Sequence, residues 1–426
     1  MERRLAAWDN VMKYFSALMT VLFISFSILG LSACGCGDDD DDRGESSGDD
    51  DTADNDDDDL QGGLISYTRV VPSDGLPDSI ELKNANNNLD VVRHEGRVFL
   101  AFRTARNHFA DKNAIVHVVS SADEQSWDFE SSFTMGTDLR EPRLLSFDGM
   151  LFLYISLLGE NALDFEPQGL VVTQYNGPED WTETQNILDD NFIAWRTKTI
   201  DGVPYMLAYT GGESVYDPEG GAMEVHWLTT EDGYEWEPVV PGQPVVMEGG
   251  CSETDFEFLD NGDLVAVCRN EKGDEDGWGS KICRAPANDL GAWECVPDKK
   301  KYDSPLVFKH NSEIYLIGRR NLNINGHYDL GWNHLPEAIR FLMYELDYWT
   351  HQKRTTLWRV DPTALSVKFI VDLPSRGDTC FPGLIKLDDS SYAVYNYSSP
   401  LTGPDLIWVK GQLGPTYIYR SVLDFE

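Results

Sequence analysis

Short apolar runs alternate with tight polar turns along most of the chain, and long stretches of helical periodicity are nearly absent. Most of these turns are two-residue pairs such as Asp-Gly or Asn-Gly, which supply the positive φ that hairpin turns favour. Each pair of runs therefore predicts a β-hairpin. Four strong copies and two weaker ones give six hairpins, at Glu95-Gly96, Asp148-Gly149, Asp201-Gly202, Asn261-Gly262, Asn311-Ser312 and Ser390-Ser391.

Four tryptophans mark a longer period. Trp127, Trp181, Trp236 and Trp293 lie 54, 55 and 57 residues apart, and each closes a turn-rich phrase that follows one of the hairpins. Self-similarity at a fixed spacing of this length indicates a repeat architecture. In the first unit we expect strands at 89–92, 98–102 and 115–119 and a fourth strand after Trp127. Four short strands repeated radially form a propeller blade, so the pattern predicts an all-β, six-bladed β-propeller of four-stranded antiparallel blades.

The last two units depart from the pattern. Unit five contains an insertion around residues 323–336, and its outer part near Trp349 and Trp358 is poorly defined. Unit six has a hairpin, 381–387 and 392–397, and a third strand at 416–425, but then the chain ends. The unpaired segment Ile65–Val71 would complete unit six as its outermost strand. We therefore expect an N-terminal strand to close the ring, which also removes exposed sheet edges.

The N-terminus has the organisation of an export signal. A basic start precedes an apolar run that ends in Leu-Ser-Ala-Cys, with Cys34 last. This is typical of a secretory signal rather than a membrane span, and the ending resembles a bacterial lipobox. We expect a lipoprotein signal peptide at 1–33, lipidation of Cys34, and export to the outer membrane, facing the periplasm or the outside. An ordinary signal peptide or an uncleaved anchor is the alternative.

The next segment, 34–63, is acidic. It carries fourteen Asp and Glu residues and one Arg between Asp38 and Asp59, with no aromatic residue. Such a segment cannot bury enough apolar surface to offset its ordering entropy, which predicts a disordered tether ahead of a propeller domain at 64–426. Calcium binding by the Asp run is a less favoured alternative.

Charge and cysteine content limit the partners. The formal net charge is −39; the tether contributes −13 and the segment before it +1, which leaves −27 for the rest of the chain. This argues against nucleic acid and leaves the lipid anchor as the only expected membrane contact. The spacing of Cys251 with Cys268 and of Cys283 with Cys295 would suit neighbouring strands, although spacing does not decide connectivity. No metal-ligand spacing appears, and we expect no metal and no cofactor.

Candidate chemistry follows from the register of the repeat. In a blade the first strand begins, and the second ends, beside the same mouth of the central channel. The seventh residue after each hairpin turn therefore marks one ring of positions. Those six residues are Arg103, Ser156, Tyr209, Arg269, Arg319 and Tyr397. Three Arg and two Tyr in one ring are unusual for so acidic a protein.

The starts of the first strands supply acids to the same mouth. We expect Arg103, Arg269 and Arg319 to clamp a carboxylated ligand, because a guanidinium fork matches a carboxylate. Paired carboxylates suit glycosidic bond cleavage. The candidates are Asp90 and Asp255 as acid and base and Glu141 or Tyr397 as nucleophile partner, with Arg143, Tyr209 and Asp378 as further binding residues. The alternative is structural, because channel Arg–acid networks can serve only to tie blades together.

The Trp phrases resemble the Asp-box turn of the sialidase superfamily, Ser-x-Asp-x-Gly-x-Thr-Trp, and Asp232-Gly233 with Trp236 is the best copy. The resemblance implies a six-bladed propeller with these turns at the blade periphery, where they have a structural role. In sialidases a Tyr activated by a carboxylate acts as nucleophile.

The chain departs from that family at two positions. Asn88-Leu89-Asp90 stands where sialidases carry Arg-Ile-Pro, and Phe381 stands in the position of the nucleophilic Tyr. Either Tyr397 or Tyr209 takes that role, or a carboxylate does, or there is no sialidase reaction.

The sequence therefore predicts a glycan-binding envelope lipoprotein and, in its stronger form, a sialidase-like glycoside hydrolase. The alternative of another class is a non-catalytic module that binds glycan or protein. A five-bladed, carboxylate-only glycosidase is a further alternative, against which the six hairpins count. A catalytic site requires acids about 5 to 10 Å apart around an open pocket, whereas a scaffold requires the same acids paired with Arg in a closed channel.

Overall fold

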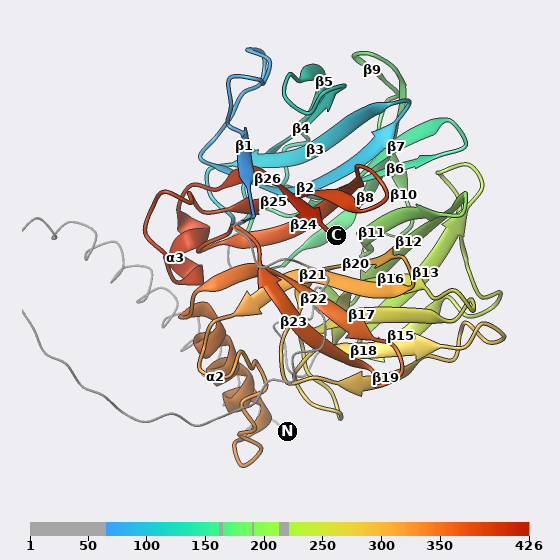
Figure 1. Cartoon of the computed structure of the whole chain (residues 1–426), viewed down its shortest axis with the longest axis vertical. Helices are drawn as coiled ribbons and strands as arrows, with labels where there is room; N and C mark the ends of the chain where they lie inside the picture. The colour runs from blue at the N-terminus through green and yellow to red at the C-terminus, as the bar shows by residue number, and fades with distance from the viewer. Residues whose placement is uncertain (1–64, 162–164, 190, 213–220, 426) are drawn as a thin grey trace, which may run out of the picture. The chain divides into compact units, whose positions relative to one another are not determined.

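A computed structural model describes residues 65–161, 165–189, 191–212 and 221–425 (Figure 1). Within these residues the strands form six antiparallel sheets. The first strands of successive sheets contact one another in a closed cycle, from β2 through β6, β11, β16, β20 and β24 back to β2. The six-bladed β-propeller predicted from the hairpin and Trp patterns is thereby confirmed.

Each sheet is a blade whose strands follow one another outward from the axis in chain order, except that the outermost strand of the last blade is β1. Blade 1 consists of β2 (Ala85–His94), β3 (Arg97–Ala105), β4 (Ile115–Ser121) and β5 (Asp128–Phe133). Blade 2 consists of β6 (Leu139–Phe147), β7 (Met150–Leu158) and β8 (Pro167–Gly177), with β9 (Asp180–Trp181) and β10 (Gln185–Ile187) sharing the outer edge. Blade 3 consists of β11 (Ile193–Ile200), β12 (Val203–Thr210) and β13 (Met223–Thr230), with β14 (Trp236–Pro238) and β15 (Val245–Gly249) outside.

The remaining blades complete the ring. Blade 4 consists of β16 (Cys251–Phe258), β17 (Leu264–Asn270), β18 (Lys281–Ala285) and β19 (Glu294–Pro297). Blade 5 consists of β20 (Asp303–His310), β21 (Glu313–Asn321), β22 (Lys353–Asp361) and β23 (Ser366–Asp372). Blade 6 consists of β24 (Thr379–Lys386), β25 (Ser391–Ser398), β26 (Tyr417–Asp424) and β1 (Tyr67–Val71).

Blade 6 joins the two ends of the described chain. Strand β1 pairs antiparallel with β26, and Tyr67 lies opposite Ser421. Val70 and Val71 are buried in the core, at 3% and 0% exposed. The N-terminal strand therefore supplies the outermost strand of the last blade, as expected from the missing fourth strand of unit six.

The four periodic tryptophans pack between blades. Each ring contacts an aromatic ring of the preceding blade. The pairs are Trp127 with Tyr395, Trp181 with Phe133, Trp236 with Tyr154 and Trp293 with Trp227, with ring centroids 6.4, 6.3, 5.7 and 6.4 Å apart. The turn before Trp236 is held by Asp232, whose Oδ1 accepts the backbone N–H groups of Tyr234 and Glu235, both at 2.8 Å. The repeat thus provides a side-chain contact from each of these four blades to the one before it.

Blade 5 differs from the sequence expectation. The insertion continues beyond Pro336 into a 13-residue helix, α2 (Glu337–Trp349), which lies beside the short helix α3 (Trp408–Leu413) (Figure 1). The expectation that Trp349 belongs to the outer part of the blade is therefore wrong, whereas Trp358 lies in the third strand. The helix was missed because its buried face is aromatic: Phe341, Tyr344 and Tyr348 pack with Trp278 and Trp408. Such residues are typical of strands as well as helices.

The cysteine spacings correspond to two cross-strand disulfides within blade 4. Cys251 on β16 is bonded to Cys268 on β17, and Cys283 on β18 is bonded to Cys295 beside it on β19. Cys380, on β24, is buried and free.

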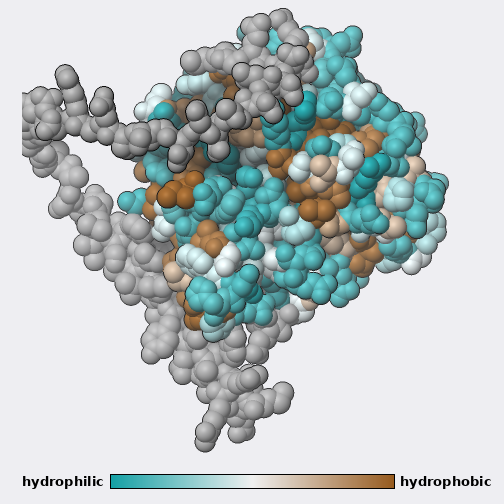
Figure 2. Space-filling view, turned by 60° about the horizontal axis from the view of Figure 1, so that its bottom comes forward, coloured by the Kyte–Doolittle hydropathy of each residue, from teal (hydrophilic) through white to brown (hydrophobic). Residues whose placement is uncertain are grey.

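The predicted signal peptide, Cys34 and the whole of the predicted acidic tether lie outside the described residues. In the part of the chain that the structure does describe, no helix is both long and apolar enough to span a bilayer. The face shown in Figure 2 is largely hydrophilic, with hydrophobic residues in separate patches.

Candidate functional site at the propeller axis

The first strand of every blade is interrupted by a bulge at the same place. The unpaired residues are Asn88, Glu141-Pro142, Trp195, Ser252-Glu253, Ser304-Pro305 and Phe381-Pro382. A bulge bends its strand and redirects the side chains around it. The residues carry backbone strain as well: φ is positive at Asn88 (43°), Glu141 (49°), Ser304 (56°) and Phe381 (52°). Such conformations cost about 1 to 3 kcal/mol each in a non-glycine residue, and they cluster at functional sites.

The bulges meet at the centre of the ring. Trp195 of blade 3 contacts Phe381 of blade 6, with ring centroids 5.2 Å apart, although these blades lie on opposite sides. The guanidinium carbon of Arg143, from blade 2, lies 4.7 Å from the Trp195 ring centroid and 5.6 Å from that of Phe381. Asn88 Nδ2 of blade 1 donates to Glu141 Oε1 of blade 2 at 3.1 Å. The bulged residues therefore line the axis itself.

Several polar atoms in this layer are buried without a hydrogen-bond partner in the described chain. They are the acceptors Asn88 Oδ1 and Glu141 Oε2, the donors Arg143 Nε, Nη1 and Nη2 and Trp195 Nε1, and the hydroxyls of Ser252 and Ser304. Arg143 is paired with an acid, Glu141, whose Oε2 lies 3.5 Å from Arg143 Nη2. More than nine in ten buried polar groups in proteins have a partner, so a cluster of this kind indicates a polar occupant of the axis.

Two glutamates adjoin these atoms. Burial, followed by the negative charge of Glu253, raises the pKa of Glu141 to about 7, and the nearby arginines, Arg143 first, oppose the rise. Burial also raises the pKa of Glu253, against the charge of Arg269. The hydroxyl of Tyr209 shares this environment, because burial and then the charges of Glu141 and Glu253 hold its pKa well above the usual range. Two carboxyl groups that resist ionisation are therefore coupled at the axis.

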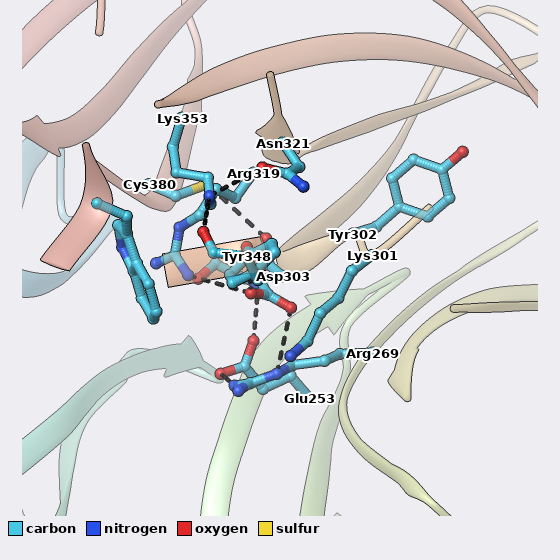
Figure 3. A network of polar contacts seen from close by, with 12 residues as sticks. Glu253, Arg269, Lys301, Tyr302, Asp303, Arg319, Asn321, Tyr348, Lys353 and Cys380 are labelled. Carbon is cyan, nitrogen blue, oxygen red and sulfur yellow. Dashed lines mark hydrogen bonds and ion pairs between the residues drawn. The ribbon is translucent and has the colours of Figure 1, made fainter. Parts of the chain in front are cut away.

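Arg269 neutralises the acids on one side of the cluster. Its guanidinium pairs with Glu253 and lies 3.2 Å from Asp303 Oδ1 (Figure 3). It also pairs with Glu271. Its side chain is 19% exposed, more than those of its partners. Lys301 Nζ lies 2.8 Å from Glu271 Oε2 and adds a second positive charge beside these carboxylates. Three protein carboxylates therefore occupy the guanidinium that we expected to clamp a ligand.

Arg319 is satisfied in the same way but is more deeply buried. Its Nη1 donates to Asp303 Oδ2 at 3.2 Å and its Nε to the Thr379 carbonyl at 2.7 Å (Figure 3). The Tyr348 hydroxyl donates to the same Asp303 oxygen at 2.6 Å. Burial acts to raise the pKa of Asp303, but Lys301, Arg269 and Arg319 together hold it well below its usual range. Asp303 is therefore a permanent anion between two arginines.

Tyr397 and Asp378 adjoin Arg319 in a second buried group. The Tyr397 hydroxyl donates to Asp378 Oδ1 at 3.0 Å and lies 3.4 Å from Arg319 Nη2. His108 Nδ1 lies 2.7 Å from Asp378 Oδ2. Burial first, and then the Asp378 charge, hold the pKa of Tyr397 well above its usual range. Tyr397 is 0% exposed, so its oxygen is not presented to a ligand in this conformation.

Arg103 lies on β3 and is connected to the group around Asp378 through Asn87 and His108. Its Nε and Nη2 donate to Asp138 Oδ1 at 3.0 and 2.7 Å, and its remaining contacts are backbone carbonyls of the loop after β3 and the Asn87 side chain. The side chain is 0% exposed. The structure therefore does not bring Arg103, Arg269 and Arg319 to one open surface.

Asp90 and Asp255 connect neighbouring blades. Asp90 Oδ2 accepts the backbone N–H of Leu144 at 2.9 Å, and Asp255 Oδ2 accepts that of Val307 at 2.7 Å. Arg196 lies between them, 3.9 Å from Asp90 and 3.6 Å from Asp255. Burial raises the pKa of Asp90, against the charges of Arg143 and Arg196. This arrangement matches the structural alternative for the channel residues, in which acids are paired with arginine.

The structure thus divides the predicted site residues into three groups. The group at the axis consists of Glu141, Arg143, Tyr209 and Arg269. The adjoining buried group consists of Arg319, Tyr397 and Asp378. The contacts between strands or between blades involve Arg103, Asp90 and Asp255.

Two kinds of residue were missing from the predicted site. The bulged Asn88 and Ser304 were both missed. A sequence signal exists for Ser304, because an X-Pro dipeptide recurs at the bulge as Glu141-Pro142, Ser304-Pro305 and Phe381-Pro382, whereas Asn88 is followed by Leu89 and lacks it. Tyr348, which comes from the inserted helix, has no sequence signal that ties it to Asp303. Within the described ranges, no group of three or more His, Cys, Asp or Glu residues could hold a metal ion.

Comparison with known proteins shows the fold alone. No family model matches the sequence, and no curated protein matches it either. Among solved structures, a protein of unknown function from Dyadobacter fermentans is 15% identical, with a TM-score of 0.54, over 80% of this chain and 95% of that one. Trypanosoma rangeli sialidase in complex with the inhibitor DANA is 13% identical, with a TM-score of 0.55, over 84% of this chain.

The same sialidase in complex with sialic acid is 12% identical, with a TM-score of 0.53, over 80% of this chain. The chain spans 54% and 60% of the length of these two sialidase chains. Because all three identities are low, the comparisons establish that the chain has the propeller fold of these structures.

Proposed function

We propose that the chain binds a glycan at the propeller axis and hydrolyses a glycosidic bond there. The observation that carries the proposal is the cluster of buried, unpartnered donors and acceptors at the bulges. A sugar ring presents hydroxyl groups that both donate and accept, so it can satisfy Arg143 and Trp195 together with Asn88 and Glu141. An apolar ligand would leave all these groups unpaired, at about 1 to 3 kcal/mol each.

The two axial glutamates supply the chemistry. Glu141 Oε1 accepts from Asn88, whereas Oε2 has no hydrogen-bond partner, so we assign to Oε2 the proton that the raised pKa, about 7, keeps on part of the population at neutral pH. In the proposed reaction Glu141 gives this proton to the glycosidic oxygen as the bond to the anomeric carbon breaks. Glu253 takes a proton from the water that forms the new bond to that carbon, and this proton returns to Glu141 afterwards. A raised pKa for the acid beside a second carboxylate is the arrangement that such catalysis uses.

The contacts of the three arginines that we expected to clamp a carboxylate argue against a sialidase reaction, and Arg143 is the axial arginine whose donors lack a partner. Arg103 and Arg319 are fully buried, and Arg269 is surrounded by three carboxylates. A ligand carboxylate would have to displace them against a background of negative charge. Phe381 in the position of the sialidase Tyr supports the same inference, because it packs against Trp195 and cannot act as a nucleophile.

A hydrolysis assay tests the proposal. The full chain is incubated with 4-methylumbelliferyl glycosides of neutral sugars and of sialic acid, and the released fluorophore is measured. We expect release from a neutral glycoside and a loss of about 100-fold or more in Glu141→Gln and in Glu253→Gln. The exposed Glu313→Gln serves as the matched control and should retain the rate. Absence of release from every glycoside, or an unchanged rate in Glu141→Gln, would contradict hydrolysis.

A non-catalytic glycan-binding module is the second candidate. It is favoured by the small exposure of the two glutamates, 7% for Glu141 and 5% for Glu253, which limits the access of a hydrolytic water to them. A module of this kind would bind glycan at the same axial groups without releasing the fluorophore.

We also propose that the chain is an outer-membrane lipoprotein, on the basis of the Leu-Ser-Ala-Cys ending. Mass spectrometry of the mature N-terminus tests this. We expect an acylated peptide that begins at Cys34 and its loss in Cys34→Ala; a mature chain that begins elsewhere would contradict it.

A further inference from the structure

A cavity separate from the axial layer lies beside the loop that joins β3 to β4. Its volume is about 440 Å³, within the range of small-ligand sites. It is lined by Lys83, Arg106, Ala110, Asp111, Lys112, Asn113 and Glu160. Three cations therefore line one cavity of a propeller that otherwise carries a large excess of acidic residues.

The lining contains positive charge that the protein does not neutralise. Lys112 is paired with Glu160 at 3.3 Å. The Asp111 carboxylate accepts the backbone N–H groups of Asn113 at 3.0 Å and Arg106 at 3.2 Å, and these hydrogen bonds outweigh burial and lower its pKa.

The other two cations lack an acidic partner. The Lys83 ammonium donates to the carbonyl of Asn113, which bears no charge. The Arg106 guanidinium has no ion pair or hydrogen bond to any residue in the described part of the chain. One carboxylate or sulfate could therefore be held between Lys83 and Arg106 without displacing an existing pair.

The loop that carries Arg106 is anchored to the blade. The carbonyls of Asn107 and Phe109 accept from Arg103 at 3.2 and 3.0 Å, and His108 is bound to Asp378 at 2.7 Å. Because this part of the loop is fixed by buried groups, less ordering entropy is lost on binding than for a free loop.

We propose that this cavity is an accessory site for one anionic group of an acidic saccharide. Lys83 and Arg106 bind the anion, and the Glu160 carboxylate accepts from a hydroxyl of the same sugar. The choice of a saccharide as the carrier rests on the proposed function, whereas the anion site itself does not depend on the axial glutamates.

Calorimetric titration of the full chain at low ionic strength tests the site. The probes are sodium glucuronate, sodium sulfate and methyl glucoside, which separate an acidic sugar, a free anion and a neutral sugar. We expect glucuronate to bind, and added sodium chloride to weaken it by screening. Arg106→Gln should weaken it about tenfold or more, through loss of charge-assisted hydrogen bonds, and the Lys83→Gln, Arg106→Gln double variant should abolish it.

A matched control tests the specificity of the site. Arg359→Gln removes an exposed arginine from β22, where it is paired with Glu313 at 3.7 Å, and should leave glucuronate binding unchanged. Because Lys83 and Arg106 lie outside the axial layer, these outcomes do not depend on the result of the hydrolysis assay. The proposal is overturned if glucuronate does not bind, whether or not sulfate does. It is also overturned if Arg106→Gln binds glucuronate as tightly as the unaltered protein.

Discussion

At the scale of the residue, Glu141 combines two costs that a purely structural residue would avoid. Its backbone has φ of 49° without being glycine, and its carboxyl group is buried with one oxygen unpartnered. Sequences usually agree with their fold at every level, and departures concentrate at functional sites. The sequence placed both Glu141 and Asp90 at the channel mouth. It could not show that Glu141 lies in the bulge of β6, whereas Asp90 is a paired residue of β2.

A pH-dependent stability measurement tests the environment of Glu141. The folded pKa of about 7 lies above the ordinary value of 4.5. Folding therefore opposes ionisation: the native state is relatively most stable below pH 4.5 and loses stability as pH rises through 7. In Glu141→Gln this loss is absent. We therefore compare the free energy of unfolding of Glu141→Gln with that of the unaltered protein at two pH values. The difference, variant minus unaltered protein, should increase by up to about 3 kcal/mol from pH 5 to pH 8.

Urea unfolding at the two pH values provides the measurement, with the exposed Glu313→Gln as the control. An identical stability difference at pH 5 and pH 8 would show that Glu141 ionises normally in the folded protein.

At the scale of the element, the Trp phrases made the blade register predictable from the sequence, but not the contacts between blades. Their spacing predicted the blade register, because a repeat imposes the same local pattern at a fixed interval. Their partners were not predictable, because each Trp contacts an aromatic ring that belongs to the preceding blade. The helix α2 was missed for a related reason: its aromatic face is complementary to Trp278 and Trp408, which are distant in sequence.

Removal of one Trp should weaken the contact between two blades. Trp236 packs on Tyr154 of the preceding blade and is partly buried. We expect Trp236→Ala to lower the free energy of unfolding by about 2 to 4 kcal/mol, since the side chain leaves a cavity between blades 2 and 3. Thermal or urea unfolding measures the effect. Phe369→Ala, at a side chain that is 48% exposed, should cost less than about 1 kcal/mol. Equal losses in the two variants would contradict an inter-blade role.

At the scale of the whole molecule, the ring is closed by a strand that comes from the other end of the sequence. The requirement for closure was predictable from counting strands, because an open blade 6 would expose the edge of β26. The division of the axial charges was not predictable. It depends on which side chains from six separate blades meet at the centre. The sequence grouped Arg103 with Arg269 and Arg319, whereas in the structure Asp303 lies between Arg269 and Arg319, and Arg103 is paired with Asp138.

A charge placed in the closing strand tests this closure. Val71 is fully buried, whereas Tyr67 on the same strand is 46% exposed. We expect Val71→Asp to lower the free energy of unfolding by roughly 3 kcal/mol or more, because a carboxylate would be buried without a partner. Tyr67→Asp should have a much smaller effect in the same urea titration. If both variants unfolded at the same urea concentration as the unaltered protein, the strand would not be part of the closed ring in solution.

The central claim is that the unpartnered polar groups at the axis bind a hydroxylated ligand. A glycan array, probed with the full chain, is the most direct test, because it requires binding alone. We expect neutral glycans to be bound by the unaltered protein and by Glu141→Gln. The signal should fall in Ser304→Ala, which loses one axial hydroxyl, and disappear in Arg143→Met. Arg359→Met is the matched control, and unfolding curves establish that each variant is folded. An array without bound glycans, or the same glycans bound equally by folded Arg143→Met, would contradict the claim.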